Sequence, residues 1–299
     1  MKKIFPPAIL ALFLLGWCSF AIAPAAFAQS NIVGGGMYGD VKASSGGGCS
    51  QATTLNAKLD GGQNTSAVTT AVCGMVTDGD WAKLDFLYVF AINSSGNALL
   101  NWVSTSFNGT VGGTGCTFTA NAGYNNSNSS CFISTGYIPS SSGGNATLNS
   151  ATVSACQETS NTITAEGFYL GAGDASNSTL LGPFYGGITP TFADINDANF
   201  TSAGTPTNAQ GSWILSRTSS SATTLYRNGT SFSTPGGTSG ALVTVQLYVM
   251  ARNNNGTADS FTPAGSIFGY AFGGSGSINA ANIRARLNTY MTAVGASGC

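Results

Sequence analysis

Two glutamates in one short stretch are the residues of this chain that come closest to an acid–base pair. Glu158 and Glu166 lie in the segment CQETSNTITAEGF, and the 299-residue chain contains no histidine. Without histidine, catalytic arrangements of the Ser-His-Asp and Cys-His types are excluded. Glycoside hydrolysis needs two carboxyl groups about 5 to 10 Å apart. On one continuous strand these two would lie about 26 Å apart, at about 3.3 Å per residue. Only a turn at residues 159–161 could join them, so we expect no catalysis and treat glycoside hydrolysis as a distant alternative to ordinary surface carboxylates.

A second group of oxygen-bearing side chains lies in FADINDANF, residues 192–200, which contains Asp194, Asn196 and Asp197. Calcium takes several oxygen ligands from carboxylates, amides and backbone carbonyls, so this stretch is a candidate calcium site. It lacks the spacing and the final glutamate of an EF-hand loop. The structural alternative is an Asx-rich turn whose side chains bond to nearby backbone groups.

A third polar cluster, LYVMARNNNGTAD at residues 247–259, contains Asn253, Asn254 and Asn255. Asn and Gly tolerate the left-handed backbone conformation of tight turns, and this favours a structural turn. The functional hypothesis is that these amides and Asp259 hydrogen-bond to sugar hydroxyls at the rim of a β-sandwich. An aromatic ring nearby, such as Tyr248 or Phe261, would then stack on a pyranose face.

The composition predicts that β-strands position these groups. Hydrophobic residues make up 42% of the chain, aromatic residues 10% and charged residues only 7%. Short apolar runs separated by Gly, Ser and Asn are typical of an all-β domain. Residues 242–252 alternate in polarity, with Val243, Val245, Leu247 and Val249 on one face and Thr244, Gln246, Tyr248 and Met250 on the other. Asn228-Gly229 predicts a two-residue hairpin turn.

Two helices are predicted around the strands. Ala67, Val68, Ala71, Val72 and Met75 recur at helical spacing, with Thr65 or Ser66 as the cap. Residues 86–92, FLYVFAI, follow as a strand that is apolar on both faces, as a central buried strand would be. Near the end of the chain, an apolar stripe from Ile278 to Val294 predicts a second helix, capped by Ser277 and stopped by Gly295.

The N-terminus is typical of an export signal. Lys2 and Lys3 precede an apolar core, and Ala26-Phe27-Ala28 matches a cleavage site. We therefore predict a signal peptide at 1–28, a Gly/Ser-rich leader with little regular structure at 29–64, and one domain at 65–299. No later run is long enough to span a membrane, so a secreted, periplasmic or cell-surface location is expected. Without Lys2 and Lys3, 8 basic residues face 11 acidic ones and none cluster, which argues against nucleic acid as a partner.

Six cysteines remain after the signal, and in an exported chain they predict disulfides. Fifteen pairings are possible. Proximity in sequence favours Cys49–Cys73 and Cys116–Cys131, which leaves Cys156 with Cys299. Cys299 could instead be free or join two chains. With no CxxC motif and no histidine, a structural zinc site is improbable.

Three segments resemble one known family. DGDWAKLDFLYVFAINSSGNALLNW, ARNNNGTADSFTPAGSIFGYAFGG and LNTYMTAVGA are similar to phage- and prophage-encoded proteins with a concanavalin A-like, laminin-G-like domain. The resemblance covers about residues 66–108 and 211–296. It implies an all-β, two-sheet antiparallel jelly-roll sandwich with a short helical N-terminal element and a C-terminal helix. Laminin-G-like domains often hold calcium at the rim, whereas the E-x-D-x-E-like pattern of glycanases with this fold does not occur here.

These observations together predict a secreted, non-catalytic β-sandwich module that binds carbohydrate at a cell surface or matrix. The alternative is a structural or adhesive surface protein, or a virion-like assembly protein, without sugar specificity. Calcium is the cofactor that the residues allow, a glycan is the expected partner, and a homo-oligomer is possible in either case. The ligand itself is beyond what the sequence indicates.

Overall fold

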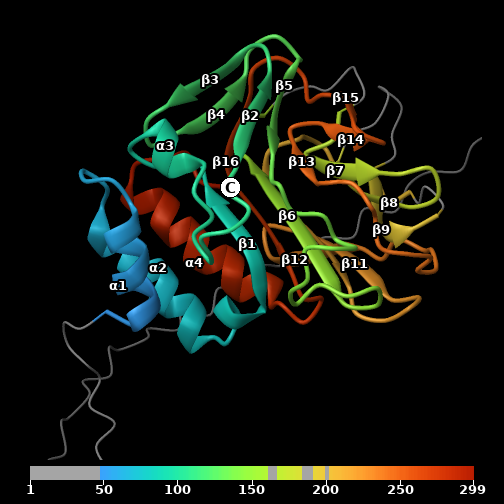
Figure 1. The fold of residues 1–299 in the computed structure, drawn as a ribbon, viewed down its shortest axis with the longest axis horizontal. Coiled ribbons are helices and arrows are strands. Elements are labelled where there is room, and N and C mark those ends of the chain that lie inside the picture. Colours follow the sequence, from blue (N-terminus) through green and yellow to red (C-terminus); the bar gives the residue numbers. More distant parts are fainter. Residues whose placement is uncertain (1–47, 161–166, 184–190, 199–201) are drawn as a thin grey trace, which may run out of the picture. The chain divides into compact units, whose positions relative to one another are not determined.

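Two β-sheets and a group of helices make up the folded chain (Figure 1). This computed structural model describes residues 48–160, 167–183, 191–198 and 202–299. The predicted signal peptide and most of the predicted leader lie outside these residues. No helix of the described ranges is both long and apolar enough to cross a membrane.

The first sheet is antiparallel throughout its described strands. Its order is β12-β11-β10-β6-β16-β4-β3, and β1 also pairs with β16. The strands are β1 Leu84–Val89, β3 Cys116–Thr119, β4 Gly123–Asn126, β6 Ala151–Gln157, β10 Gly211–Arg217, β11 Thr223–Arg227, β12 Thr230–Ser233 and β16 Ser266–Gly274. The predicted turn at Asn228-Gly229 is confirmed: both residues have positive φ, 52° and 80°, as a type I′ hairpin requires.

The second sheet has the order β15-β14-β7-β13-β5-β2, with β8 beside β7 and β9 beside β8. All of its pairs are antiparallel except β14 with β7. The strands are β2 Thr110–Gly113, β5 Cys131–Ser134, β7 Leu170–Gly173, β8 Ser178–Gly182, β9 Phe192–Asp197, β13 Tyr248–Val249, β14 Arg252–Asn254 and β15 Thr257–Asp259. The prediction of one long strand at 242–252 is wrong, because the strands there are only the two residues of β13 and, from Arg252, the start of β14, although Val243 and Leu247 are buried as expected.

Aromatic side chains fill the space between the two sheets. Tyr169, next to β7, packs edge-on against Phe268 of β16, with ring centroids 5.1 Å apart. The hydroxyl of Tyr88 in β1 donates a 2.9 Å hydrogen bond to the carbonyl of Thr135, next to β5. The two sheets therefore share one core, and the predicted two-sheet antiparallel sandwich is confirmed.

Strand β1 is buried on both faces, but it lies beside only one other strand, β16. Its second edge is completed by an asparagine side chain. The Asn101 Oδ1 accepts from the backbone N–H of Leu87 at 3.1 Å, and the backbone N–H of Trp102 donates to the Leu87 carbonyl at 2.8 Å. The prediction of a buried strand is confirmed, while its central place in the sheet is corrected: the 101–102 segment satisfies the edge.

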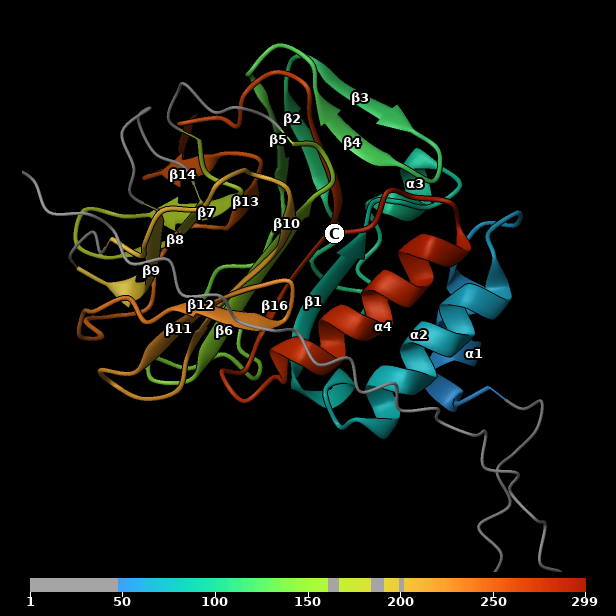
Figure 2. The ribbon, with the colours of Figure 1, turned by 180° about the vertical axis from the view of Figure 1, so that it is seen from behind.

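The helices gather beside β1 in both views (Figures 1 and 2). They are α1 Ser50–Lys58, α2 Thr65–Thr77, the 3₁₀ turn η1 Trp81–Lys83, α3 Ser95–Ala98 and α4 Ala280–Ala293. Met291 of α4 packs directly on β16, because a Cβ at Gly269 would lie 2.3 Å from its methyl carbon. The helices α2 and α4 confirm the two helical predictions.

The caps of both helices differ from the predicted ones. Asn64, not Thr65 or Ser66, caps α2, and Asn279, not Ser277, caps α4, each by accepting from backbone N–H groups of the first turn.

The helix α1 also corrects the expectation of an unstructured leader up to residue 64. Only Ala52 and Leu55 of α1 are buried, so the sequence shows no apolar stripe. A disulfide instead fastens its start to α2.

Three disulfides join the six cysteines of the described chain, in the pairing that proximity favoured. Cys49–Cys73, Cys116–Cys131 and Cys156–Cys299 have Cα separations of 5.5, 4.8 and 5.8 Å. The first joins the start of α1 to α2, the second joins β3 to β5, and the third joins β6 to the segment after α4. Disulfides of this kind persist in oxidising compartments, which fits an extracellular protein.

Candidate functional site

The asparagine cluster forms the turn of the β14–β15 hairpin. Asn255 and Gly256 are its two turn residues, with φ of 48° and 97°, which is the left-handed geometry that favours Asn-Gly. Asn253 is 1% exposed and holds the turn from inside. Its Oδ1 accepts from the backbone N–H of Gly256, and its Nδ2 donates to the carbonyl of Gln246, both at 2.8 Å. Asn253 and Asn255 therefore shape the hairpin, as the structural interpretation predicted.

The side chains of Arg252, Asn254 and Asp259 are joined by hydrogen bonds in this hairpin, and we call this group the fan. The guanidinium of Arg252 donates to both carboxylate oxygens of Asp259, at 2.7 Å each. The amide of Asn254 donates to Asp259 Oδ2 at 2.9 Å. Burial raises the pKa of Asp259, but the hydrogen bonds from Arg252 and Asn254 outweigh it and hold the pKa below its usual value. The fan is thus a fixed, ionised and partly exposed group.

A polar cavity of about 160 Å³ lies between this hairpin and the turn that joins β7 to β8. Arg252 and Asn254 form one wall, and residues 173–178 form another. Asp174 shapes that turn by accepting from the backbone N–H groups of Ser176 and Asn177, at 2.9 Å each. It also accepts from the hydroxyl and the backbone N–H of Thr244. Although burial raises the pKa of Asp174, these hydrogen bonds lower it below its usual value.

Aromatic rings lie in the same sheet, at β13 and β5. Tyr248 stacks on Phe132, with ring centroids 4.4 Å apart and an interplanar angle of 26°. Phe261 lies 6.3 Å from Phe132, and Phe132 and Phe261 are half-buried. Asn253 donates a hydrogen bond to the carbonyl of Gln246, which lies two residues before Tyr248 in the chain. The predicted ligand residues are therefore close along the chain, but Tyr248 itself is buried and Phe132 and Phe261 carry the accessible ring surface.

The functional residues that sequence reasoning missed are Arg252 and Asp174. A two-residue turn at 255–256 pairs Arg252 with Asp259, and this register is observed. The hairpin pattern could therefore have identified Arg252. Asp174 comes from a turn about eighty residues away in sequence, and no local pattern links it to the hairpin. Together the fan and the cavity can hold a polar, uncharged ligand, since the charges in the fan are already paired.

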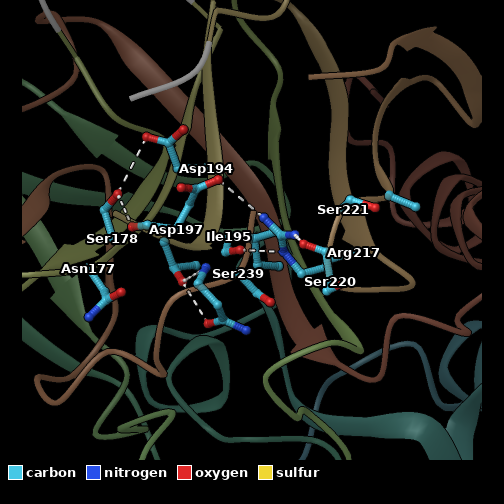
Figure 3. A network of polar contacts seen from close by, with 12 residues as sticks. Asn177, Ser178, Asp194, Ile195, Asp197, Arg217, Ser220, Ser221 and Ser239 are labelled. Carbon is cyan, nitrogen blue, oxygen red and sulfur yellow. Dashed lines mark hydrogen bonds and ion pairs between the residues drawn. The ribbon is translucent and has the colours of Figure 1, made fainter. Parts of the chain in front are cut away.

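The calcium candidates lie elsewhere, in the interior of the sandwich. Asp194, Asn196 and Asp197 of β9 are each at most 1% exposed. Arg217 of β10 reaches them from the first sheet and is itself 1% exposed. Its Nε donates to the Ile195 carbonyl at 2.7 Å, its Nη1 to the Ser220 carbonyl at 2.8 Å, and its Nη2 lies 3.4 Å from Asp197 Oδ2 (Figure 3).

The remaining side chains of this buried network also have protein partners. Asp194 accepts from the Ser178 hydroxyl at 3.4 Å, as Figure 3 also shows. Asn196 donates to the carbonyls of Thr147 and Leu148, at 3.2 and 3.1 Å. Burial lowers the pKa of Arg217, and the charges of Asp197 and Asp194 oppose that shift. The guanidinium is therefore the positive charge that these two carboxylates face.

These residues do not fit a calcium ion. Calcium needs six to eight oxygen ligands at about 2.3–2.6 Å, and here Arg217 directs an N–H group at Asp197 Oδ2, while the amide of Asn196 donates to two backbone carbonyls. Across the described part of the chain, no group of three His, Cys, Asp or Glu side chains is arranged to hold a metal ion. The predicted Asx-rich turn is not observed either, because Asn196 lies in β9 and its amide donates to carbonyls 49 and 48 residues away.

The glutamate pair cannot be tested as a pair, because Glu166 lies outside the described residues. Glu158 is 5% exposed and lies beside the chain end that follows α4. The backbone N–H of Ser297 donates to its Oε2 at 3.2 Å. Burial raises the pKa of Glu158 to about 7, against the lowering effect of the Ser297 hydrogen bond.

Comparison with known proteins defines the fold but no family. No known family model matches this chain, and no curated protein matches it. Solved structures that are similar to this chain include the following three. Domain 4 of a GH43 extracellular arabinanase from Geobacillus stearothermophilus, in complex with arabinotriose, is 16% identical, with a TM-score of 0.49 over 69% of this chain and 98% of that chain. The binding domain of botulinum neurotoxin serotype D is 11% identical, with a TM-score of 0.50 over 72% of this chain and 52% of that chain.

Trypanosoma rangeli sialidase, in complex with the inhibitor DANA, is 13% identical, with a TM-score of 0.46 over 69% of this chain and 32% of that chain. This chain therefore spans about half of the toxin domain and about a third of the sialidase. None of the three is a phage protein, so the phage-type resemblance stays a prediction. The likeness to the toxin binding domain concerns the fold alone, and on that basis the chain is a two-sheet β-sandwich protein.

Proposed function

We propose that this chain is a carbohydrate-binding β-sandwich module that holds a neutral glycan at the β14–β15 hairpin. The hairpin site consists of Asp174, Arg252, Asn254 and Asp259. The observation that carries the proposal is the Arg252–Asp259–Asn254 fan at the wall of a polar cavity. Groups held in place before binding lose little conformational entropy when a ligand arrives, and this favours affinity.

The charge of the site supports an uncharged ligand. Asp259 is paired with Arg252 through two hydrogen bonds, so a charged ligand would have to compete with an existing ion pair. A sugar hydroxyl both donates and accepts, and it can add to the free edges of the carboxylate and the amide without breaking the pair.

The same electrostatics support binding rather than cleavage. A glycosidase needs one carboxylic acid with a raised pKa to protonate the leaving oxygen. Hydrogen bonds hold the pKa of Asp174 and of Asp259 below the usual value, so both are ionised at neutral pH. Neither carboxylate of the hairpin site is therefore a proton donor. With export through the predicted signal peptide, we place the module outside the cell, at a surface or in a matrix.

A glycan array followed by calorimetry tests the proposal. The wild-type protein should bind at least one neutral glycan, and the double variant Asn254→Ala/Asp259→Ala should lose at least about tenfold in affinity, the effect of about 1.4 kcal/mol. Ser231→Ala is the matched control, since it is an exposed position on the other two-residue hairpin, β11–β12. It should bind as the wild type does.

Two outcomes overturn the proposal. If no glycan binds the wild type, and the protein instead assembles with rising concentration regardless of sugar, the structural or adhesive alternative holds. If a glycan binds but the double variant binds it equally well, the hairpin site is wrong. Circular dichroism of each variant shows whether a loss of binding reflects unfolding.

A further inference from the structure

The chain segment that follows α4, residues 295–299, is fastened beside β6 at two adjacent points. Cys299 forms a disulfide with Cys156 of β6, and the backbone N–H of Ser297 donates to Glu158 Oε2 at 3.2 Å. Ser297 lies two residues before Cys299, and Glu158 lies two residues after Cys156. The two attachments are therefore neighbours, and we call the segment 295–299 the clasp.

The clasp shields its own disulfide from solvent. Cys156 is 0% exposed and Cys299 is 8% exposed. Thiol–disulfide exchange requires a thiolate to reach one of the two sulfur atoms, so its rate depends on access. The helix α4 ends at Ala293, before the clasp, and Gly295 has a φ of 79°, as is common where a helix ends. The clasp can therefore lift from β6 while α4 stays in place, and this local opening controls how fast the disulfide reacts.

The carboxyl group of Glu158 makes the closed clasp sensitive to ionisation. Glu158 is 5% exposed, and its Oε1 is buried with no hydrogen-bond partner among the residues that the structure describes. The group is wedged between β16 and α4, because a Cβ at Gly269 would lie 2.5 Å from Oε1 and 2.3 Å from the methyl carbon of Met291. Burial disfavours the ionised form and raises the pKa of Glu158 to about 7. The closed clasp therefore favours the neutral carboxyl group.

The other ionisable groups around the clasp come from α4 and β16. Arg284 of α4 donates to the Cys299 carbonyl, at 3.1 and 2.6 Å, and an arginine stays charged throughout the ordinary pH range. Tyr270 of β16 donates its hydroxyl proton to the Ser212 hydroxyl of β10 at 2.6 Å, and burial raises the pKa of Tyr270 to about 12. In the described part of these elements, Glu158 is therefore the group whose charge changes between mildly acidic and neutral pH.

We propose that Glu158 is a proton-controlled gate for thiol exchange at the Cys156–Cys299 disulfide. While the carboxyl group is neutral, the clasp stays closed; when the group loses its proton, the clasp opens more often and an external dithiol reaches the sulfurs. One thiolate of the dithiol attacks a sulfur atom, and the other cysteine leaves as a thiolate and takes up a proton. The second thiol then closes the dithiol into a disulfide and releases the first cysteine. The dithiol loses two electrons, and Cys156 and Cys299 become two thiols.

The rate of disulfide reduction in the wild type and in Glu158→Gln tests the gate. Glutamine keeps an acceptor for the Ser297 N–H and cannot ionise. A water-soluble phosphine is the reductant, because it also reduces disulfides in acid, and the ratio of the two rates cancels its own dependence on pH. Alkylation and peptide mass spectrometry measure the reduced fraction at Cys299. The ratio of wild type to variant should rise at least about tenfold from about pH 5 to pH 7.5, because opening releases the Glu158 proton in this window.

Controls within the same chain separate the gate from general unfolding. The Cys49–Cys73 disulfide joins α1 to α2, and its ratio of rates should not change with pH. Asp60→Asn makes the same chemical change at an exposed carboxylate and should leave the Cys156–Cys299 profile as in the wild type.

Amide hydrogen exchange, measured by nuclear magnetic resonance, gives a second readout. Relative to Glu158→Gln, the Ser297 amide of the wild type should lose protection as pH rises. The Leu87 amide, which donates to Asn101 Oδ1 in the core, should not.

The inference is overturned if the ratio of wild-type to Glu158→Gln rates stays constant with pH. It is also overturned if the Cys49–Cys73 ratio rises along the same curve, or if the Ser297 and Leu87 amides lose protection together, since both results indicate unfolding of the whole chain. The gate uses none of the hairpin residues, so the double variant Asn254→Ala/Asp259→Ala should keep the wild-type pH profile. The outcome is therefore independent of whether the hairpin binds a glycan.

Discussion

Two stretches rich in aspartate and asparagine, β9 and the β14–β15 hairpin, use the same residue types for different ends. In both, an arginine from the framework meets a carboxylate. In β9 the side chains of Arg217 and Asp197 are each 1% exposed, whereas in the hairpin Arg252 is 18% and Asp259 34% exposed. The buried pair joins the two sheets, whereas Arg252 of the exposed pair lines a polar cavity. Burial, and not composition, separates a structural network from a candidate binding site.

The largest effect should come from removing the buried arginine. Arg217→Leu leaves Asp197 and Asp194 in the interior without the guanidinium and deprives the Ile195 carbonyl of its donor. Breaking a buried pair from one side typically costs about 3–5 kcal/mol of unfolding free energy. Urea denaturation followed by circular dichroism measures the loss.

The control for Arg217→Leu is Arg286→Leu, which removes an arginine that is 42% exposed and bound to Asp78. It should cost less than about 1 kcal/mol. If the two variants lose the same stability, the contrast between buried and exposed pairs is wrong for this protein.

Glu158 is a buried carboxylate without a guanidinium partner, and it should make the free energy of unfolding depend on pH. The pKa of Glu158 is raised from 4.5 to about 7. Between these values the unfolded chain has lost the proton that the native chain keeps, so the free energy of unfolding falls as pH rises through this window. The loss from pH 4 to pH 8 should be about 3 kcal/mol, at about 1.4 kcal/mol per unit of pKa shift.

Glu158→Gln keeps an acceptor for the Ser297 N–H and removes the ionisation. Its unfolding free energy should exceed that of the wild type at pH 8 and approach it at pH 4. Thermal unfolding at a series of pH values checks this, and parallel curves for the two proteins would contradict a native carboxyl that titrates near neutrality.

The smallest effect on stability should come from the exposed pair. Asp259→Asn removes the charge that faces Arg252 but keeps an acceptor, and partly exposed ion pairs contribute only about 0–1 kcal/mol. We expect the melting temperature to change little while glycan affinity falls. A loss of stability comparable to that of Arg217→Leu would show that the fan supports the fold rather than a ligand.

Sequence patterns predicted those elements that are determined by residues close to one another in the chain. The Asn228-Gly229 turn, the α2 stripe at Ala67 to Met75 and the buried run at 86–92 follow from backbone geometry and periodicity, and all three are observed. The disulfide pairing followed from proximity in the chain. In each case the residues that determine the element lie within or close to it.

The remaining features of the fold and of the candidate site depend on contacts between distant parts of the chain. Arg217 and Asp197 meet across two sheets, and Glu158 meets Ser297 from 139 residues away. The alternation at 242–247 is read correctly for burial at Val243 and Leu247, yet these residues form no strand. The calcium hypothesis overlooked a distant contact in the same way, because Arg217 supplies a positive charge beside Asp197.

The Cys156–Cys299 disulfide has a mechanical consequence. It links the segment after α4 to β6, a strand with neighbours on both sides in the first sheet. A pulling force applied at Cys299 would therefore load the middle of the sandwich in shear and would not unwind α4 first. In reducing solution the same force would detach the helix at much lower tension, so oxidation state would set how this protein resists being pulled.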